Sequence, residues 1–223
     1  DPFYPRHQGA LVTQDWPGPR NWHQRFREDF LFSGDDVGED ATLWGTVAVF
    51  FGCFGAGIPR TSDFHPLKAS RAWDRLNLAD KALLAPLPRR LLSHPNGGAL
   101  AVIGHVERAW TVSLKDGPGA LAERDIDAFK ELFRLLMQGY PVGAAMEEMN
   151  TRFSSCAVAV TQKLYSIAHQ GVPFPDSLKS VIARLWTASN DARSYVIVGD
   201  PAVRLPVAAR GTDLPSRAEG TGM

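Results

Sequence analysis

Three apolar runs in this sequence each end in a turn of small residues that carries a polar or reactive group. They are VAVFFGCFGAG, ALAVIGHVE and YVIVGDP, and they place Cys53, His105 and Asp200 at the ends of apolar segments. Such runs predict buried β-strands. The predicted strands cover residues 43–52, 98–103 and 195–198. Ligands bind at the carboxyl ends of parallel strands in α/β sheets, so we expect all three residues along one rim.

Helical periodicity dominates the second half of the chain. Apolar residues recur at helical spacing over 126–137, 143–169 and 178–186. A leucine-rich stretch over 79–92 has similar spacing, but Pro86 and Pro88 should break or distort it. The pattern predicts an α/β fold with a mostly parallel sheet, helices on both faces and a helix-rich second half. We expect one domain over residues 1–206 and a disordered tail over 207–223.

Composition limits the kinds of partner. Lys plus Arg and Asp plus Glu number 24 each, so the formal charge is zero and no nucleic-acid partner is expected. No apolar run approaches the length of a membrane span and no signal-peptide pattern opens the chain. We therefore expect no membrane association and a cytoplasmic location. The two cysteines do not form a disulfide framework, and a reducing compartment would keep Cys53 a free thiol.

Cys53 is the sharpest candidate for chemistry. The end of a buried strand would hold it in place, the glycines at 52, 55 and 57 leave room for a substrate backbone, and its own N–H could bind an oxyanion. The alternative is a structural cysteine, because free cysteine often packs as a small hydrophobic residue. Position alone does not decide between these two interpretations.

The order of three segments resembles a known family. Gly52-Cys53-Phe54-Gly55-Ala56-Gly57, then the strand from Gly97 to Gly104, then Val198-Gly199-Asp200-Pro201 resemble the caspase-like cysteine peptidases. The similarity is closest to the gingipain-like and CHAT branches and runs from about the start of the chain to Leu205. The resemblance implies a cysteine at the end of a central strand, a pocket lined by the next strand, and a Gly-Asp-Pro strand that closes the domain.

The histidine base of that family is not recognisable in the sequence. The family has a histidine followed by glycine on the strand before the cysteine strand, and none of the six histidines here precedes a glycine. His7 lies 46 residues before Cys53, close to the caspase spacing, but no apolar strand leads into it. We expect His7 and His23 to be solvated loop residues. By the resemblance, the chain lacks its N-terminal strand or strands, and the base lies upstream of Asp1.

The remaining candidates have smaller predicted roles. By resemblance His105 or Glu107 belongs to the pocket wall and contacts substrate; a capping histidine is the alternative for His105. Asp200 is predicted to shape the rim as a turn residue, because the sequence Gly-Asp-Pro is typical of a turn. Cys156 is expected to pack between helices and take no part in chemistry. No cluster has metal-ligand spacing, and a thiol nucleophile requires no metal or organic cofactor.

Two functions of different classes follow. The first is a cysteine endopeptidase domain that hydrolyses peptide bonds in a peptide or protein substrate, with further domains in the parent chain implied by the resemblance. The second is a non-catalytic caspase-like module for interaction or assembly, favoured by the missing histidine. A doubly wound domain that binds a small molecule is weaker, because the sequence has no glycine-rich phosphate loop.

Overall fold

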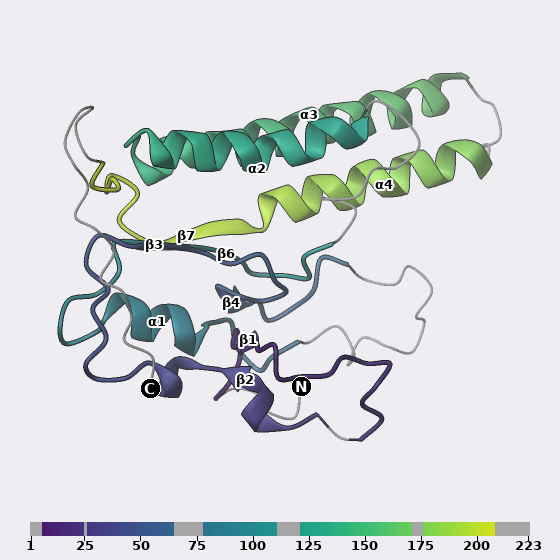
Figure 1. Ribbon diagram of the computed structural model, residues 1–223. Helices are drawn as coiled ribbons and strands as arrows, with labels where there is room; N and C mark the ends of the chain where they lie inside the picture. Colours follow the sequence, from purple (N-terminus) through teal and green to yellow (C-terminus); the bar gives the residue numbers. More distant parts are fainter. Residues whose placement is uncertain (1–5, 25, 65–77, 111–120, 171–175, 208–223) are drawn as a thin grey trace.

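The computed structural model describes residues 6–24, 26–64, 78–110, 121–170 and 176–207 (Figure 1). The strands are β1 (Leu11–Val12), β2 (Leu31–Phe32), β3 (Val47–Val49), β4 (Gly57–Ile58), β5 (Leu83–Leu84), β6 (Ala101–His105) and β7 (Tyr195–Gly199). The helices are α1 (Pro86–Leu92), α2 (Leu121–Met137), α3 (Val142–Gln170) and α4 (Asp176–Arg193), with short 3-10 turns η1 (Glu28–Phe30) and η2 (Gly34–Asp36). Apart from Val207, the predicted tail lies outside the described residues.

The central sheet has the order β3-β6-β7 and is mixed in direction. β3 runs parallel to β6, with Val47 opposite Ala101, whereas β7 is antiparallel to β6, with Tyr195 opposite His105. Two small antiparallel pairs, β1-β2 and β4-β5, lie apart from it. The α/β class is confirmed, but the described sheet contains one parallel and one antiparallel pairing. It is not the mostly parallel sheet that the strand pattern predicted.

The strand that leads to Cys53 is much shorter than expected. A turn precedes it, in which the Thr46 N–H donates to the Leu43 carbonyl at 3.2 Å and Gly45 has a φ of +70°. A second turn follows, in which Gly55 N–H donates to Gly52 O at 3.4 Å. The apolar run is therefore divided by turns, and only residues 47–49 pair with β6. These residues are half-buried, and among the described strands β3 is an edge of the sheet rather than the expected central, fully covered strand.

Helices cover both faces of the central sheet, as predicted. Figure 1 shows α2, α3 and α4 stacked on one face and α1 on the other. The helices expected over 126–137, 143–169 and 178–186 are confirmed within α2, α3 and α4. The prediction for 79–92 was partly wrong, since Pro86 begins α1 instead of breaking it. Proline is tolerated in the first turn, where its missing N–H would have no helical partner.

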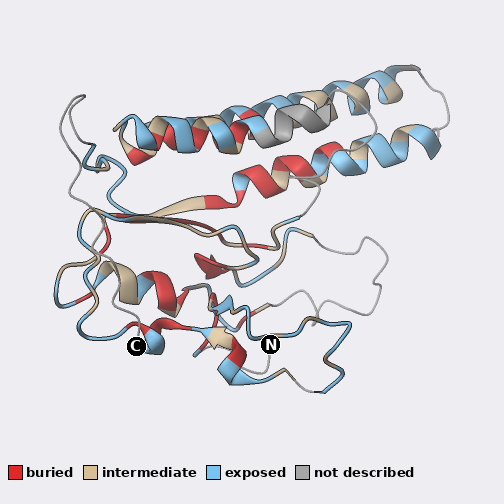
Figure 2. Cartoon of the chain, in the orientation of Figure 1, coloured by how far each residue is buried: buried red, intermediate tan, exposed pale blue. Residues whose placement is uncertain are grey.

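The main core lies between the sheet and the α2–α3 pair. It contains Ala101 and Ile103 of β6 together with Leu132, Met149 and Tyr195. Figure 2 shows the buried residues concentrated where these helices face the sheet and exposed residues along their outer sides. No helix in the described ranges is at once long and apolar enough to cross a lipid bilayer.

Candidate functional site

The loop that carries Cys53 packs directly on the end of β6. The Phe54 N–H donates to Glu107 O at 2.9 Å, and the Ala56 N–H donates to His105 O at 3.0 Å. Gly104 permits this approach, because a Cβ there would lie 3.0 Å from the Ala56 nitrogen and 3.1 Å from its Cβ. Cys53 is therefore presented by a loop whose main chain is tied to the neighbouring strand.

Cys53 itself is exposed. Its Sγ donates to the carbonyl oxygen of Ala109 at 3.8 Å. The next residue, Phe54, has a φ of +58°, a left-handed conformation that is uncommon for residues other than glycine. The N–H groups of Phe54, Gly55 and Ala56 are engaged in the bonds given above. Within the described part of the chain the Cys53 N–H has no acceptor, so it remains available to a substrate carbonyl.

His105 is placed beside this loop but is fully buried. Both ring nitrogens lie beside carbonyl oxygens, Nε2 3.0 Å from Asp191 O and Nδ1 2.7 Å from Glu107 O, and the Glu107 nitrogen lies 3.1 Å from Nδ1. Both ring nitrogens are thus committed to the fold. Contrary to the expectation of a pocket-wall residue, a substrate could not reach this side chain, and the capping alternative describes it better.

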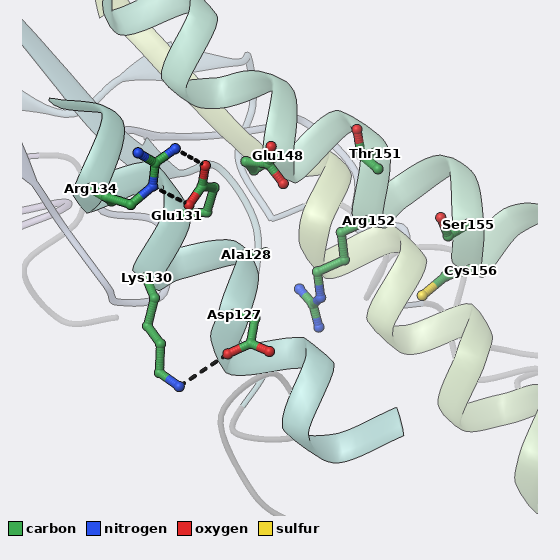
Figure 3. Close-up of a pocket in the computed structure, with 10 residues that line it drawn as sticks. All are labelled: Asp127, Ala128, Lys130, Glu131, Arg134, Glu148, Thr151, Arg152, Ser155 and Cys156. Atoms are coloured by element: carbon green, nitrogen blue, oxygen red, sulfur yellow. Dashed lines mark hydrogen bonds and ion pairs between the residues drawn. The ribbon is translucent and has the colours of Figure 1, made fainter. Parts of the chain in front are cut away.

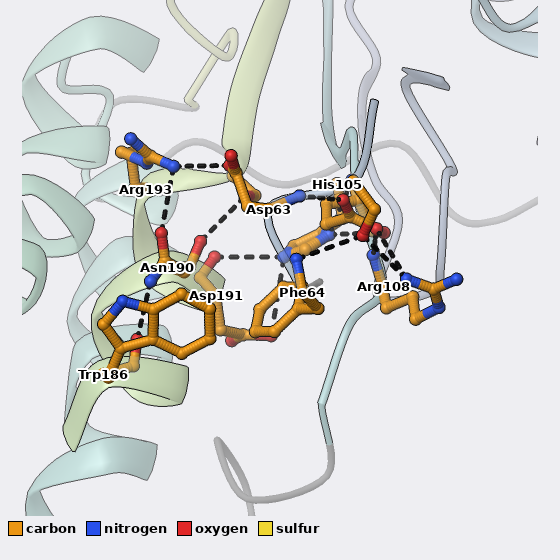
Figure 4. Close-up of polar contacts among 11 residues, drawn as sticks. Asp63, Phe64, His105, Arg108, Trp186, Asn190, Asp191 and Arg193 are labelled. Carbon is orange, nitrogen blue, oxygen red and sulfur yellow. Dashed lines mark hydrogen bonds and ion pairs between the residues drawn. The ribbon is translucent and has the colours of Figure 1, made fainter. Parts of the chain in front are cut away.

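Glu107 is also interior, with 2% of its surface exposed. Its Oε2 accepts the Asp63 N–H at 3.0 Å and its Oε1 accepts the Arg108 N–H at 2.9 Å. Figure 4 shows this group of contacts, with Arg108 and Asp63 around the same region. The Glu107 carbonyl thus binds the residue after Cys53, and its carboxylate binds the N–H groups of Asp63, beyond β4, and of Arg108. Its observed contacts are with the main chain of the protein, whereas the sequence predicted a contact with substrate.

Asp200 does not share the rim with Cys53. In the antiparallel register Gly199 lies opposite Ala101, at the start of β6, whereas His105 is the last residue of β6 and Cys53 follows the end of β3. The predicted common rim is therefore wrong for Asp200, because it assumed that all three strands run in one direction. Its side chain accepts the Ala202 N–H at 2.8 Å, which agrees with the expected turn chemistry.

The same antiparallel register brings two unpredicted residues to the Cys53 end: Asp191 in the last turn of α4 and Tyr195 at the start of β7. Asp191 is fully buried. Burial raises the pKa of the Tyr195 phenol above its ordinary value of 10.0, and the Asp191 carboxylate raises it further, so the phenol stays protonated. Its buried hydroxyl has no hydrogen-bond partner among the described residues. A carboxylate in the last turn of a helix is unfavourable to the helix dipole. This unusual position could have identified Asp191 from the sequence as a residue with a special role.

The other histidines lie away from the thiol. His7 was expected to be solvated, but its side chain is only 6% exposed and its Nε2 lies 2.5 Å from Glu28 Oε1. His23 is exposed, as predicted. His65 lies outside the described residues. None of the five described histidines forms a hydrogen bond with Cys53 Sγ, so this part of the chain does not supply a Cys/His dyad.

Cys156 is half-buried on α3 and lines a cavity of about 640 Å³ between α2 and α3. Figure 3 shows its sulfur beside Arg152 and Ser155, with the Arg134–Glu131 and Lys130–Asp127 ion pairs across the cavity. We expected Cys156 to face closed helix packing; it borders an open space instead.

In the described ranges no group of three or more histidine, cysteine, aspartate or glutamate side chains is arranged to hold a metal ion. Comparison of the chain with models of protein families, with curated proteins and with solved structures gives no match. The chemistry of the site must therefore be argued from its residues alone.

Proposed function

We propose that this chain carries the nucleophile of a cysteine endopeptidase and that Cys53 is that nucleophile. The observation that carries the proposal is an exposed thiol in a loop bonded to the end of β6, with the backbone N–H of the same residue free of any described partner. Acyl transfer needs this combination, because the thiolate attacks a carbonyl carbon while an N–H stabilises the negative oxygen that forms. The left-handed Phe54 supports the proposal, since such backbone strain concentrates at functional sites.

The proposed reaction also needs a base for the thiol proton. We assign it to a histidine outside the described residues, and the resemblance to caspase-like peptidases puts it on a strand before Asp1. The thiolate then attacks the scissile carbonyl, the base returns the proton to the leaving amine, and water hydrolyses the resulting thioester. A thiol without a base to accept its proton is a weak nucleophile, so the 223-residue chain alone should cleave peptides very slowly.

Peptide-library cleavage under reducing conditions tests this assignment. The 223-residue chain is compared with a form that includes the residues encoded before Asp1, which should cleave about 10²–10⁴-fold faster if they supply the base. In the longer form Cys53→Ala should abolish cleavage, and the matched variant Cys156→Ala should leave it nearly unchanged. If the short form already cleaves and His65→Ala stops it, the base is a histidine of the 223-residue chain and not one before Asp1.

The second candidate is a non-catalytic module for protein interaction. It is favoured by the absence of a histidine at the Cys53 sulfur among the described residues. If the longer form is inert although its histidine folds beside Cys53, the peptidase proposal fails and this second candidate gains support.

A further inference from the structure

The peptide group between Ala109 and Trp110 is hydrogen-bonded at both of its polar atoms. Its oxygen, on Ala109, accepts from the Sγ of Cys53 at 3.8 Å. Its N–H, on Trp110, donates to Oδ1 of Asp191 at 2.8 Å. One amide therefore stands between the exposed thiol and a fully buried carboxylate.

Asp191 is itself held by several elements of the fold. Its Oδ2 lies 3.6 Å from Nη1 of Arg152 on α3, a side chain that is only 5% exposed. Its backbone oxygen lies 3.0 Å from His105 Nε2, and its Oδ1 lies 3.4 Å from the same nitrogen. Figure 4 shows Asp191 on α4, on the side of the helix that faces the segment containing His105 and Arg108. The carboxylate is thus a rigid support for the amide.

A second observation places the same groups close together. The Tyr195 ring contacts the His105 ring edge-on, with centroids 4.7 Å apart, and stacks on the ring of Phe51, two residues before Cys53, at 6.3 Å. His105 in turn contacts Asp191. The chain from carboxylate to amide to thiol therefore lies within one small region at the start of β7.

Peptide resonance couples the two ends of the amide. A carboxylate that accepts the N–H increases the negative charge on the carbonyl oxygen, and hydrogen bonds in such chains strengthen one another. Only the thiol form of Cys53 can donate to that oxygen, because a thiolate has no proton to give. The amide therefore sets the direction of the S–H group before any reaction.

We propose that Asp191 is a positioning residue for Cys53, which it orients through the Ala109–Trp110 amide. Asp191 touches neither substrate nor sulfur; it fixes the carbonyl that holds the sulfur. The importance of this orientation for catalysis rests on the proposed peptidase role of Cys53. The hydrogen bond to Ala109 O orients the thiol whether or not Cys53 has that role. Loss of the carboxylate frees the amide, and the sulfur then turns toward solvent.

The test measures alkylation of Cys53 by iodoacetamide at pH 7 in the full chain, read by peptide mass spectrometry. Asp191→Ala should react about threefold to tenfold faster, the range that corresponds to losing one modest hydrogen bond. Asp191→Asn keeps an oxygen that can accept the Trp110 N–H, and should stay within about twofold of the unmodified protein. Asp200→Ala, which removes a carboxylate at the other end of the sheet, is the matched control and should react at the original rate.

The rescue by asparagine separates positioning from a merely structural role. If Asp191→Ala alkylates at the original rate, or if Asp191→Asn reacts as fast as Asp191→Ala while both are folded, the proposal is overturned.

A measurement on the unsubstituted chain covers the case in which neither variant folds. There the Trp110 amide should exchange its hydrogen slowly, and alkylation of Cys53 should shift its ¹H–¹⁵N signal. A Trp110 amide that exchanges freely, or a signal that does not move, overturns the proposal. Peptide cleavage enters neither measurement, so this inference and the peptidase assignment can fail separately.

Discussion

At the end of the sheet where β3 and β6 finish, Cys53 sits in a loop whose bonds reach residues far along the chain. Its sulfur contacts Ala109, 56 positions away, and Glu107 binds Asp63 across 44 positions. At the opposite end, Asp200 closes a turn onto Ala202, two residues away. The side chains at the Cys53 end make long-range contacts, whereas the Asp200 carboxylate makes a local one, although the main chain beyond it is bonded to α3 through Pro201 O and Val203 O.

The two ends also differ in how they accommodate unusual backbone. Gly199, beside Asp200, has a φ of +123°, which glycine adopts at little steric cost. Phe54, beside Cys53, has a φ of +58° and carries a side chain. A left-handed residue other than glycine persists only where its surroundings hold it there. The long-range bonds at the Cys53 end supply that restraint, and the following predictions test this difference.

The largest effect is expected at Glu107. Glu107→Ala removes a buried carboxylate that accepts two backbone N–H groups, those of Asp63 and Arg108, in a partly buried site. We expect a loss of about 3 kcal/mol in the free energy of unfolding, measured by urea denaturation. Glu107→Gln keeps one acceptor oxygen and should lose about half as much. A loss below about 1 kcal/mol for the alanine variant would show that the loop is held in some other way.

Gly199 should be the most sensitive position tested at the opposite end. Gly199→Ala forces a side chain onto a φ of +123° and puts its Cβ 3.0 Å from the Leu100 oxygen, a backbone atom that cannot move aside easily. Thermal or urea unfolding should show a destabilisation of about 2 kcal/mol. Alkylation of Cys53 should be unchanged, because the strain lies at the other end of the sheet. A changed alkylation rate would show that the two ends are coupled.

Phe54 offers a smaller but sharper test. Phe54→Gly and Phe54→Ala both remove the ring, so their difference reports only the backbone preference at this position. Glycine should be more stable than alanine by about 1 kcal/mol, the reverse of the usual order, because φ is +58°. Equal stabilities measured by urea denaturation would mean that the loop relaxes to another conformation once the ring is gone.

The smallest effect is expected at Asp200. Asp200→Ala removes the bond from the Ala202 N–H at an exposed turn and should cost about 0.5 kcal/mol. Asp200→Asn retains an acceptor and should be nearly neutral in thermal unfolding. If Asp200→Ala is as damaging as Glu107→Ala, the distinction between the local bond of the Asp200 carboxylate and the long-range bonds of Glu107 does not hold.

Local pattern predicted much of this fold. The spacing of apolar residues located α2, α3 and α4, and the Gly-Asp-Pro sequence indicated a turn at Asp200. The position of Cys53 after a strand was also predicted, although β3 proved to be three residues long because turns at Gly45 and Gly52 interrupt the apolar run. These features depend on neighbouring residues, so periodicity and turn chemistry are sufficient to indicate them.

The sequence by itself determined the helices α2, α3 and α4, where apolar runs end, and that Cys53 stands in a turn of small residues. Only the tertiary structure decided the antiparallel direction of β7, and with it the separation of Asp200 from Cys53 and the arrival of Asp191 and Tyr195 at the site. Strand direction depends on how the α3–α4 pair returns the chain to the sheet, which no local pattern records. Burial of His105 and Glu107 follows for the same reason: their partners, Asp191 and Asp63, become neighbours only once the chain has folded.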